Sequence, residues 1–453
     1  MNKKINIFLI TIDCLRYDHV GCFGNKEKLT PNIDDISNNS VLFSQAIVNG
    51  SSTPFSFPSI FSSSYPLIDP NFPNLSRFRL TLPEILKNKG FKTAGFNSNP
   101  YLSKYYNYDI GFTYFDDIFS KTKEQNQKGV KGFIKKHKKL NSIITKIYAK
   151  LRIKHKIKPP YERAEDINQR VLSWVKENPK GIFVWMHYMD THHPFLPPKE
   201  FRNTSARKMY RAEKILGRNP PKMSEKELKN IKNLYKGTIR YVDYAIGNFF
   251  NELKNLGVYK NSLIIITSDH GEEFLDHRGV SHVWKLYEEL IHVPLLFKFP
   301  GRLRQLKVNK LVTLLDLAPS IIDYLGFEKV DDFLGVSFMS VINEDKQQYY
   351  RKSVISESLT KDGNISLSYK EGYRVTSYRT EKWKLILNQE TNSKELYNLK
   401  DDPYESKNIY NDNEKIAKDF EQKIADHIEK EEILRDKFRK RQKLRDVVKK
   451  ISF

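Results

Sequence analysis

Three apolar runs, each ending at an aspartate, constrain this chain more than any other feature. They are continuous and rich in β-branched or aromatic residues, as strands buried on both faces are. The runs are INIFLITID (5–13), GIFVWMHYMD (181–190) and NSLIIITSDH (261–270). Parallel sheets covered by helices are built from such strands, and they bind ligands beyond the carboxyl ends of the strands. Because Asp13, Asp190 and Asp269 stand at those ends, we expect a site there.

Helical patterns separate the runs, for example at 81–90 and 163–177. This alternation predicts a doubly wound, mostly parallel α/β sheet. From 351 to 412 the pattern changes to short extended pieces, which indicate a small C-terminal subdomain, mainly antiparallel. The last segment, 413–453, is charged and repeats apolar residues at helical spacing. It is predicted to be a helix that either docks on the body or forms a homodimer.

The net charge of +23 is concentrated in two segments. Residues 121–160 hold fourteen Lys and Arg against a single acid, and most of the remaining excess lies in the last twenty residues. Because the charge belongs to these appendages, we expect no specific nucleic acid as a partner. The segment 121–160 is predicted to be a basic helical insertion. It is either simply solvated or drawn to an anionic membrane or polysaccharide.

The cysteine content and the lengths of the apolar runs indicate the cellular compartment in which the protein is expected. Cys14 and Cys22 offer no disulfide framework and no zinc-site spacing. No run of eighteen apolar residues occurs, and the stretch 5–12 is too short for a signal-peptide core. We therefore expect a cytoplasmic protein, either free or peripheral to the membrane.

Asp13 and the pair Asp269–His270 form the first chemical constellation. A carboxylate at one strand end and an Asp–His pair at another supply oxygen and imidazole ligands for a divalent cation. Gly271 permits a tight turn behind the pair, which leaves both side chains free to converge. The alternative is that Asp13 caps a helix and that the pair is an ordinary polar strand end.

The Ser- and Pro-rich segment 51–66 is the second constellation. Pro58 at a first helical position would place Ser56 just before a helix N-terminus, where backbone N–H groups face an anion. A hydroxyl there can be both a metal ligand and a nucleophile. Composition alone also allows an unstructured loop.

Histidines follow two of the three runs. His192 and His193 come soon after the second, and a polar pocket is the expected surrounding for at least one of them. His277, His282 and Lys285 follow the third, and they are candidate phosphate or sulfate clamps and a general acid.

Taken in order, these motifs resemble the sulfatase family of the alkaline-phosphatase superfamily. The matching pieces include LITIDCLRYDHVGCFG, TPNIDDIS, SFPS, TAGFNSNPYL, HYMDTHHPFLPP, TSDHGEEFLDHRGVSH and ELYNLKDDPYESKNI. The resemblance covers residues 5 to 410 without the basic insertion. It implies an alkaline-phosphatase-like fold in which 1–120 and 161–350 form the catalytic domain of a metal-dependent ester hydrolase.

The resemblance also implies roles for particular residues. The implied metal ligands are Asp13, Ser56, Asp269 and His270. Ser56 is implied as the attacking group. The implied contacts to the transferred group or the leaving oxygen are His192, His282 and Lys285. Further candidates for substrate binding are Asn99, Asp190 and His277.

Departures from the family pattern leave the ester class open. Ile60 stands where sulfatases carry an arginine, Cys14 replaces a second acid, and Asn97 to Asn99 replaces a Lys-x-His pair. The first reading is sulfate-ester hydrolysis with Ca²⁺ and formylglycine at Ser56. The second is a phosphodiesterase or phosphotransferase acting on sugar or lipid phosphates with unmodified Ser56 and Mn²⁺ or Zn²⁺. His270 after Asp269 favours the second reading, since it resembles phosphodiesterase and phosphonate ester hydrolase relatives.

Two further readings remain. Asp190, His192 and His282 could hold a second metal ion. A non-catalytic binding protein that retains the fold is the alternative from another functional class.

Overall fold

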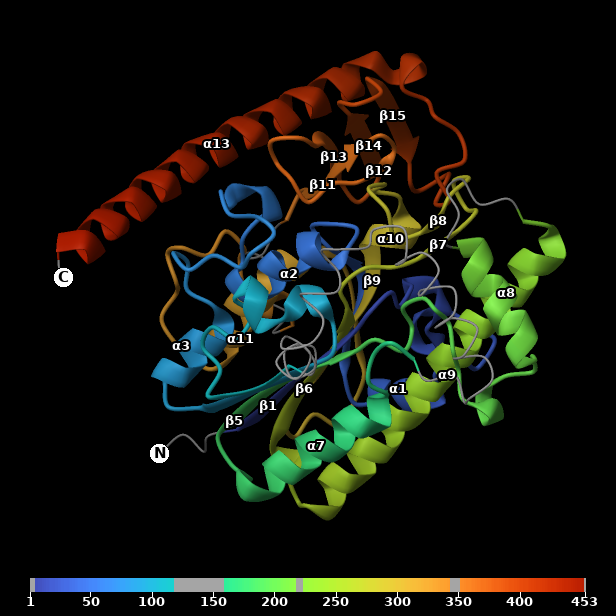
Figure 1. Cartoon of the computed structure of the whole chain (residues 1–453), viewed down its shortest axis with the longest axis vertical. Coiled ribbons are helices and arrows are strands. Elements are labelled where there is room, and N and C mark those ends of the chain that lie inside the picture. The colour runs from blue at the N-terminus through green and yellow to red at the C-terminus, as the bar shows by residue number, and fades with distance from the viewer. Residues whose placement is uncertain (1–4, 118–158, 217–222, 343–350, 452–453) are drawn as a thin grey trace, which may run out of the picture.

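The computed structural model describes residues 5–117, 159–216, 223–342 and 351–451 (Figure 1). The predicted basic insertion 121–160 falls almost entirely outside these residues, so its helical structure stays a prediction. Among the described residues, no helix combines the length and apolarity needed to cross a membrane.

An eight-stranded sheet forms the centre of the molecule, with strand order β10-β2-β9-β6-β1-β5-β3-β4. Neighbouring strands are parallel except at β9, which runs antiparallel to both β2 and β6. Its strands are β1 (Asn6–Ile12), β2 (Val41–Ile47), β3 (Lys92–Asn97), β4 (Tyr114–Asp117), β5 (Ile182–Tyr188), β6 (Ser262–Ser268), β9 (His292–Lys298) and β10 (Leu306–Thr313). The three predicted strands are β1, β5 and β6, and they lie side by side in the middle of the sheet.

Helices cover both faces of this sheet, as continuous apolar strands require. Within β1, Ile7 and Leu9 join one core while Phe8 and Ile10 join the other, and all four are fully buried. One face carries α2 (Thr53–Ser62), α3 (Leu82–Asn88) and α11 (Leu317–Tyr324). The other carries α1 (Pro31–Ser37), α7 (Ala164–Glu177), α8 (Ala206–Leu216) and α9 (Glu225–Asn255). The short helices α10 (Glu288–Ile291) and α12 (Met339–Ile342) complete the body.

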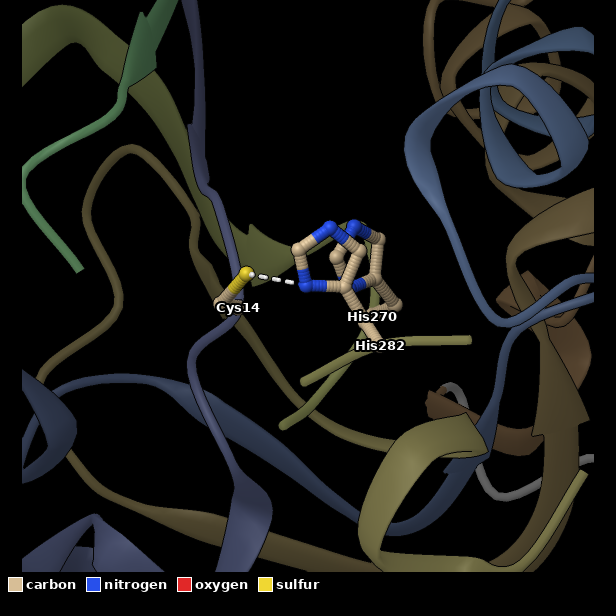
Figure 2. A group of neighbouring side chains, drawn as sticks. All are labelled: Cys14, His270 and His282. Atoms are coloured by element: carbon tan, nitrogen blue, oxygen red, sulfur yellow. Dashed lines mark hydrogen bonds between the residues drawn. The ribbon is translucent and has the colours of Figure 1, made fainter. Parts of the chain in front are cut away.

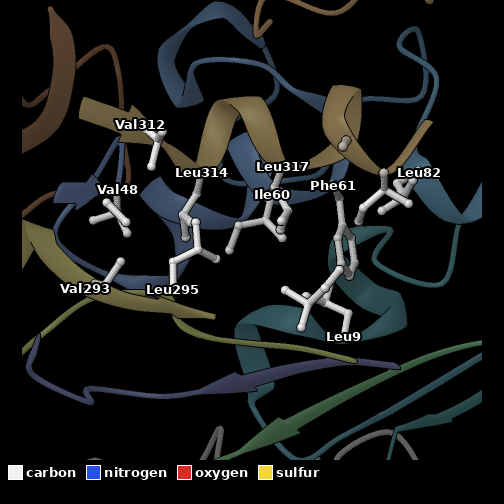
Figure 3. Packing of buried hydrophobic residues seen from close by; sticks show 14 of the residues in the cluster. Leu9, Val48, Ile60, Phe61, Leu82, Val293, Leu295, Val312, Leu314 and Leu317 are labelled. Carbon is white, nitrogen blue, oxygen red and sulfur yellow. The ribbon is translucent and has the colours of Figure 1, made fainter. Parts of the chain in front are cut away.

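The helix α2 is anchored through its apolar face. Ile60 and Phe61 of α2 pack in one cluster with Leu9 of β1 and Leu82 of α3 (Figure 3). Full burial of a side chain of this size contributes roughly 1.5–3 kcal/mol. These contacts fix the position of the helix over the sheet, and therefore the place where its N-terminus lies.

A separate antiparallel sheet follows near the C-terminus, with strand order β12-β11-β13-β14-β15. Its strands are β11 (Val354–Lys361), β12 (Asn364–Ile365), β13 (Tyr373–Arg379), β14 (Trp383–Asn388) and β15 (Ser393–Asn398). The long helix α13 (Glu414–Ile451) lies across it, with Phe420 and Ile424 buried against Leu385 and Leu396 (Figure 1). The predicted C-terminal subdomain and terminal helix are both present.

Candidate active site and metal centre

The register of the central strands brings two acids to one edge of the sheet. Ile12 pairs with Tyr188 on β5 and with Ser268 on β6, so the residues that follow β1 and β6 leave the sheet together. Asp13 and Asp269 are these residues, and both are fully buried. The carboxylates converge on His270, whose Nε2 lies 3.6 Å from Asp13 Oδ1 and 3.5 Å from Asp269 Oδ2.

His270 is held in the orientation that a metal ligand needs. Its Nδ1 lies 2.9 Å from the carbonyl of Gly271, to which it donates, so Nε2 is left to face the two carboxylates. Gly271 has little room for a side chain, because a Cβ there would lie 1.9 Å from the carbonyl oxygen of Glu289. The glycine therefore sets the tight turn that aims His270.

Thr53, the first residue of α2, supplies the hydroxyl of this cluster. Its Oγ1 donates to Asp269 Oδ2 at 2.9 Å and lies 3.4 Å from His270 Nε2. Asn99 Nδ2 lies 3.1 Å from Asp13 Oδ2 and 3.4 Å from Thr53 Oγ1, so the Asn99 amide bridges the side chains of Asp13 and Thr53. Because Thr53 begins the helix, the positive end of the α2 dipole adjoins the cluster and favours a bound anion.

The structure corrects the prediction for Ser56. The helix begins at Thr53, not at Pro58, and Pro54 occupies the early helical position that suits proline. Ser56 therefore lies one turn inside α2, where its hydroxyl donates to the carbonyl of Thr53 at 3.3 Å. Ile60 points into the core and not toward the cluster (Figure 3). The hydroxyl that contacts Asp269 and His270 is that of Thr53.

Two groups that sequence reasoning did not assign to the cluster also contact Asp13. His187, inside β5, places Nε2 3.1 Å from Asp13 Oδ2 and Nδ1 2.8 Å from Thr11 Oγ1. Trp185 Nε1 donates to the same Thr11 hydroxyl at 3.1 Å. Cys14 Sγ lies 2.9 Å from Asp13 Oδ1. Only the position of His187 in a buried strand, where a polar side chain needs a partner, could have signalled its role.

A row of imidazole rings borders the cluster. The ring centroids of His270 and His282 are 4.5 Å apart, those of His282 and His192 are 4.8 Å apart, and His192 stacks on His193 at 4.4 Å. His282 Nδ1 lies 3.3 Å from Cys14 Sγ and 3.2 Å from Glu272 Oε2 (Figure 2). His192 and His282 thus border the cluster, and their contact with a substrate stays a prediction.

The remaining candidates have partners elsewhere. Asp190 accepts from Arg163 Nη1 at 3.1 Å and from the backbone N–H of Ala164 at 2.9 Å, so it caps α7. Lys285 Nζ donates to both oxygens of Glu273 and to the carbonyl of His277.

His277 is likewise engaged outside the cluster. Its Nδ1 lies 2.7 Å from Glu289, and its Nε2 lies 3.2 Å from the carbonyl of Glu405, next to the C-terminal subdomain. The contacts of Asp190, Lys285 and His277 thus hold the fold around the site together, and none of the three joins the cluster through them.

Electrostatics distinguish the two buried acids. Burial raises the pKa of Asp13, but the hydrogen bond from His187 and the charge of His192 outweigh it and hold that pKa well below the ordinary value. Burial and the charge of Asp13 raise the pKa of Asp269. Burial lowers the pKa of His270, yet the charges of the two acids raise it overall.

The donor set of the cluster fits a divalent cation. Among the described residues, the groups that contact the two carboxylates are hydroxyl, thiol, amide and imidazole, with no lysine or arginine. Asp13, Asp269 and His270 offer ligand atoms that all lie within 4.8 Å of one another. Burying two carboxylates without a lysine or arginine beside them costs free energy unless a cation is bound between them.

Comparisons with known proteins agree with this geometry. Residues 5–327 match the family model described as Sulfatase, and residues 273–432 match the one described as N-sulphoglucosamine sulphohydrolase, C-terminal. Arylsulfatase K of Bos taurus is 29% identical over 207 residues, which is 45% of this chain and 37% of that protein. N-acetylglucosamine-6-O-sulfatase of Bacteroides thetaiotaomicron is 31% identical over 180 residues, 39% of this chain and 31% of that protein. The chain thus spans about a third of the length of these relatives.

Solved structures share the fold over nearly the whole chain. The phosphonate monoester hydrolase of Agrobacterium radiobacter superposes with a TM-score of 0.73 at 18% identity, covering 94% of this chain and 96% of that one. A putative sulfatase from Bacteroides thetaiotaomicron gives a TM-score of 0.71 at 18% identity, covering 95% and 93%. Since the Sulfatase model matches well over half of the residues, the chain belongs to the Sulfatase family.

Proposed function

We propose that this chain is a metal-dependent hydrolase of sulfate esters, with Thr53 as its attacking group and a saccharide or another small molecule as substrate. The observation that carries the proposal is the convergence of the Thr53 hydroxyl, two buried acids and His270 at the N-terminus of α2. Family membership supports sulfate esters as the substrate class, and relatives named as arylsulfatase and as a sugar 6-O-sulfatase support it further.

The family implies a divalent metal ion, which Asp13, Asp269, His270 and Thr53 would hold. When bound, such an ion acts as a Lewis acid toward the ester oxygen and lowers the pKa of a coordinated hydroxyl. The residues of the chain supply the rest of the chemistry. Asn99 and His187 fix the Asp13 carboxylate, and both contacts are buried.

Hydrolysis proceeds in two displacements at sulfur. Thr53 Oγ1 would pass its proton to Asp269 Oδ2 and form a bond to sulfur while the bond from sulfur to the leaving oxygen breaks, and the same proton would then pass from Asp269 to the leaving alkoxide. His192 and His282 border the transferred group and donate hydrogen bonds to its oxygens. Water then attacks the same sulfur, breaks the bond to Thr53, and restores its hydroxyl.

The side chain of Thr53 cannot be converted to formylglycine. Its Cβ carries a methyl group, so oxidation there gives a ketone and not an aldehyde. Ser56 has the required primary alcohol, but it lies one helical turn from the cluster. We therefore propose that the attacking hydroxyl is unmodified, in place of formylglycine at Ser56.

Thr53 also favours a second candidate function, transfer or hydrolysis of a phosphate ester. An unmodified hydroxyl must form a covalent ester that water or another alcohol then cleaves, and phosphoryl groups follow this route in many enzymes. His270 in the cluster adds an imidazole to the oxygen ligands, which suits Mn²⁺ or Zn²⁺ better than Ca²⁺.

Matched variants test both candidates. Thr53→Val removes the hydroxyl and keeps the shape, so turnover should fall at least a thousandfold, while Thr53→Ser and the neighbouring control Ser56→Ala should retain it. Turnover is measured on aryl sulfate, aryl phosphate, aryl phosphodiester and aryl phosphonate. Sulfate turnover supports the main proposal, and exclusive turnover of a phosphorus ester supports the second. Full turnover by Thr53→Val, or loss of turnover in Ser56→Ala alone, would show that Ser56 and not Thr53 is the attacking group.

The proposed organisation assigns 1–120 and 161–350 to catalysis. We propose the insertion 121–160 as a contact for an anionic membrane or polysaccharide, and the helix 413–453 as a docking element of the body. Sedimentation with anionic vesicles, and retention on a sulfated-polysaccharide column, test the first assignment against a variant that lacks 121–160. Sedimentation equilibrium distinguishes docking of α13 from homodimer formation.

A further inference from the structure

A strongly basic pocket lies outside the metal cluster, on the helices α8 and α9 and the segment that precedes α8. Figure 1 shows these two helices together at one side of the molecule. The pocket has a volume of about 390 Å³, which is within the range of small-molecule sites. Its described lining contains one acid, Glu27, and six cations: Arg202, Lys208, Lys226, Lys229, Lys236 and Arg240. The pocket therefore carries a large excess of positive charge.

Most of this charge has no acidic partner. Glu27 accepts from Lys236 Nζ at 2.5 Å and 2.7 Å, so the acid of the pocket is already paired. Within the part of the chain that the structure describes, no ion pair joins an acid to any of the other five cations. Arg202 Nε is buried and has no hydrogen-bond partner among the same residues. A buried guanidinium nitrogen without a partner costs free energy, which a bound anion would recover.

The walls of the pocket are fixed by packing. Gly237 of α9 has no room for a side chain, because a Cβ there would lie 2.5 Å from the carbonyl oxygen of Phe201 and 3.0 Å from Pro197. The segment before α8 therefore packs directly on α9 and carries Arg202 to the pocket. Met209 of α8 is buried in the core cluster that α9 also lines. Cations held on packed elements suit a specific site better than a freely solvated charged surface does.

The kinds of side chain in the pocket indicate the chemistry of its ligand. Guanidinium and ammonium groups together bind the oxygens of sulfate and phosphate groups. Three asparagines and a threonine also line the pocket, and amides and hydroxyls are partners for the hydroxyl groups of a sugar. The Thr204 hydroxyl donates to Asn230 Oδ1 at 2.9 Å, so the amide nitrogen of Asn230 is directed away from Thr204. The lining therefore fits a ligand that carries both an oxyanion and hydroxyl groups.

We propose that this pocket binds a sulfate or phosphate group that is carried on a saccharide. The proposal goes beyond the proposed function, because binding in this pocket requires no turnover at the metal cluster. The competing account is a repulsive basic surface that is simply solvated. The two accounts differ in one observable property, saturable binding of an anionic sugar that depends on the pocket residues.

A probe that cannot be hydrolysed tests the proposal separately from catalysis. In 6-deoxy-6-sulfoglucose the sulfur is bonded to carbon, so cleavage of an ester bond cannot consume it. The full chain is titrated by calorimetry with this probe, with glucose and with inorganic sulfate. We expect saturable binding of the probe that weakens as the salt concentration rises, and no measurable binding of glucose. Inorganic sulfate should bind at least about tenfold more weakly, because it lacks the hydroxyl groups.

A double variant assigns the binding to the pocket. Lys229→Gln with Arg240→Gln removes two cations of the lining, so the dissociation constant of the probe should rise by about 10- to 100-fold. The control is Lys400→Gln with Lys423→Gln, which removes the same charge from exposed positions near the C-terminus and should leave the constant unchanged. Thermal unfolding of each variant verifies that it is folded.

A single variant of nearly identical shape adds a second test. Asn230→Asp keeps an oxygen that accepts from Thr204 and adds a negative charge to the lining, so the affinity for the probe should fall at least about tenfold. An unchanged dissociation constant in either folded pocket variant, or an equal rise in the control, would overturn the proposal. Inorganic sulfate that binds as tightly as the probe would overturn its saccharide part.

Discussion

His187 offers a sensitive test of how the fold prepares the metal centre. Trp185 donates to Thr11, the Thr11 hydroxyl lies 2.8 Å from His187 Nδ1, and His187 Nε2 donates to Asp13 Oδ2 at 3.1 Å. This relay is fully buried and fixes one oxygen of Asp13. His187→Leu removes a hydrogen bond to a charged group, worth about 1.5–3 kcal/mol. Metal affinity should therefore fall by about 10- to 100-fold.

The assay is competition for metal against a chromophoric chelator, with thermal unfolding of the metal-free protein recorded in parallel. His187→Gln keeps a donor and should recover part of the affinity, which a merely space-filling histidine would not explain. His427→Gln is the control, because His427 lies on α13 beside Glu357 and Glu431. An unchanged metal dissociation constant in folded His187→Leu would refute the positioning role.

Three further predictions concern the frame of the site. Ile60→Ala opens a cavity between α2 and the sheet, so the free energy of unfolding should fall by about 2–5 kcal/mol in denaturant titrations; a change below about 1 kcal/mol would contradict the packing. Asp190→Ala leaves Arg163 and the start of α7 unpaired, so it should lower stability by about 3–5 kcal/mol without altering metal content. Loss of metal in a stable Asp190 variant would restore the ligand role predicted from sequence. Asp243 accepts from the backbone of Asn32 and Ile33, and burial raises its pKa to about 6. The contribution of the Asp243 carboxyl to the free energy of unfolding is therefore fully present below about pH 4, and it is lost as the pH rises through about 6. Unfolding of the wild type and Asp243→Asn from pH 4.5 to 7.5 should show the wild type losing about 2–3 kcal/mol relative to the variant, and parallel curves would contradict the shift.

The central strands could be predicted because their signal is local. β1, β5 and β6 are continuous apolar runs, and the polar residues after β1 and β6 mark the edge where Asp13, Asp269 and His270 meet. The start of the long helix α9 also has a signal in the sequence, since Ser224 and Glu227 form a capping box there.

The correct hydroxyl could not be predicted with the same certainty. The segment 51–66 offers several hydroxyl groups and two prolines, and choosing Pro58 as the helix start moves the assignment by one turn, from Thr53 to Ser56. The packing of Ile60 and Phe61 on the sheet decides the start, and that is a tertiary effect. The partners of Asp190 could not be predicted for a related reason, because only the folded chain brings its carboxylate to the start of α7.

The covalent intermediate tests the central claim most directly. The protein is quenched in acid during turnover of an aryl sulfate or an aryl phosphodiester, digested, and the peptide containing residues 51–66 is fragmented in a mass spectrometer. The proposed mechanism predicts the mass of one sulfuryl or phosphoryl group on Thr53, and none in Thr53→Val. A group found on Ser56, or formylglycine at that position, would contradict the assignment of Thr53.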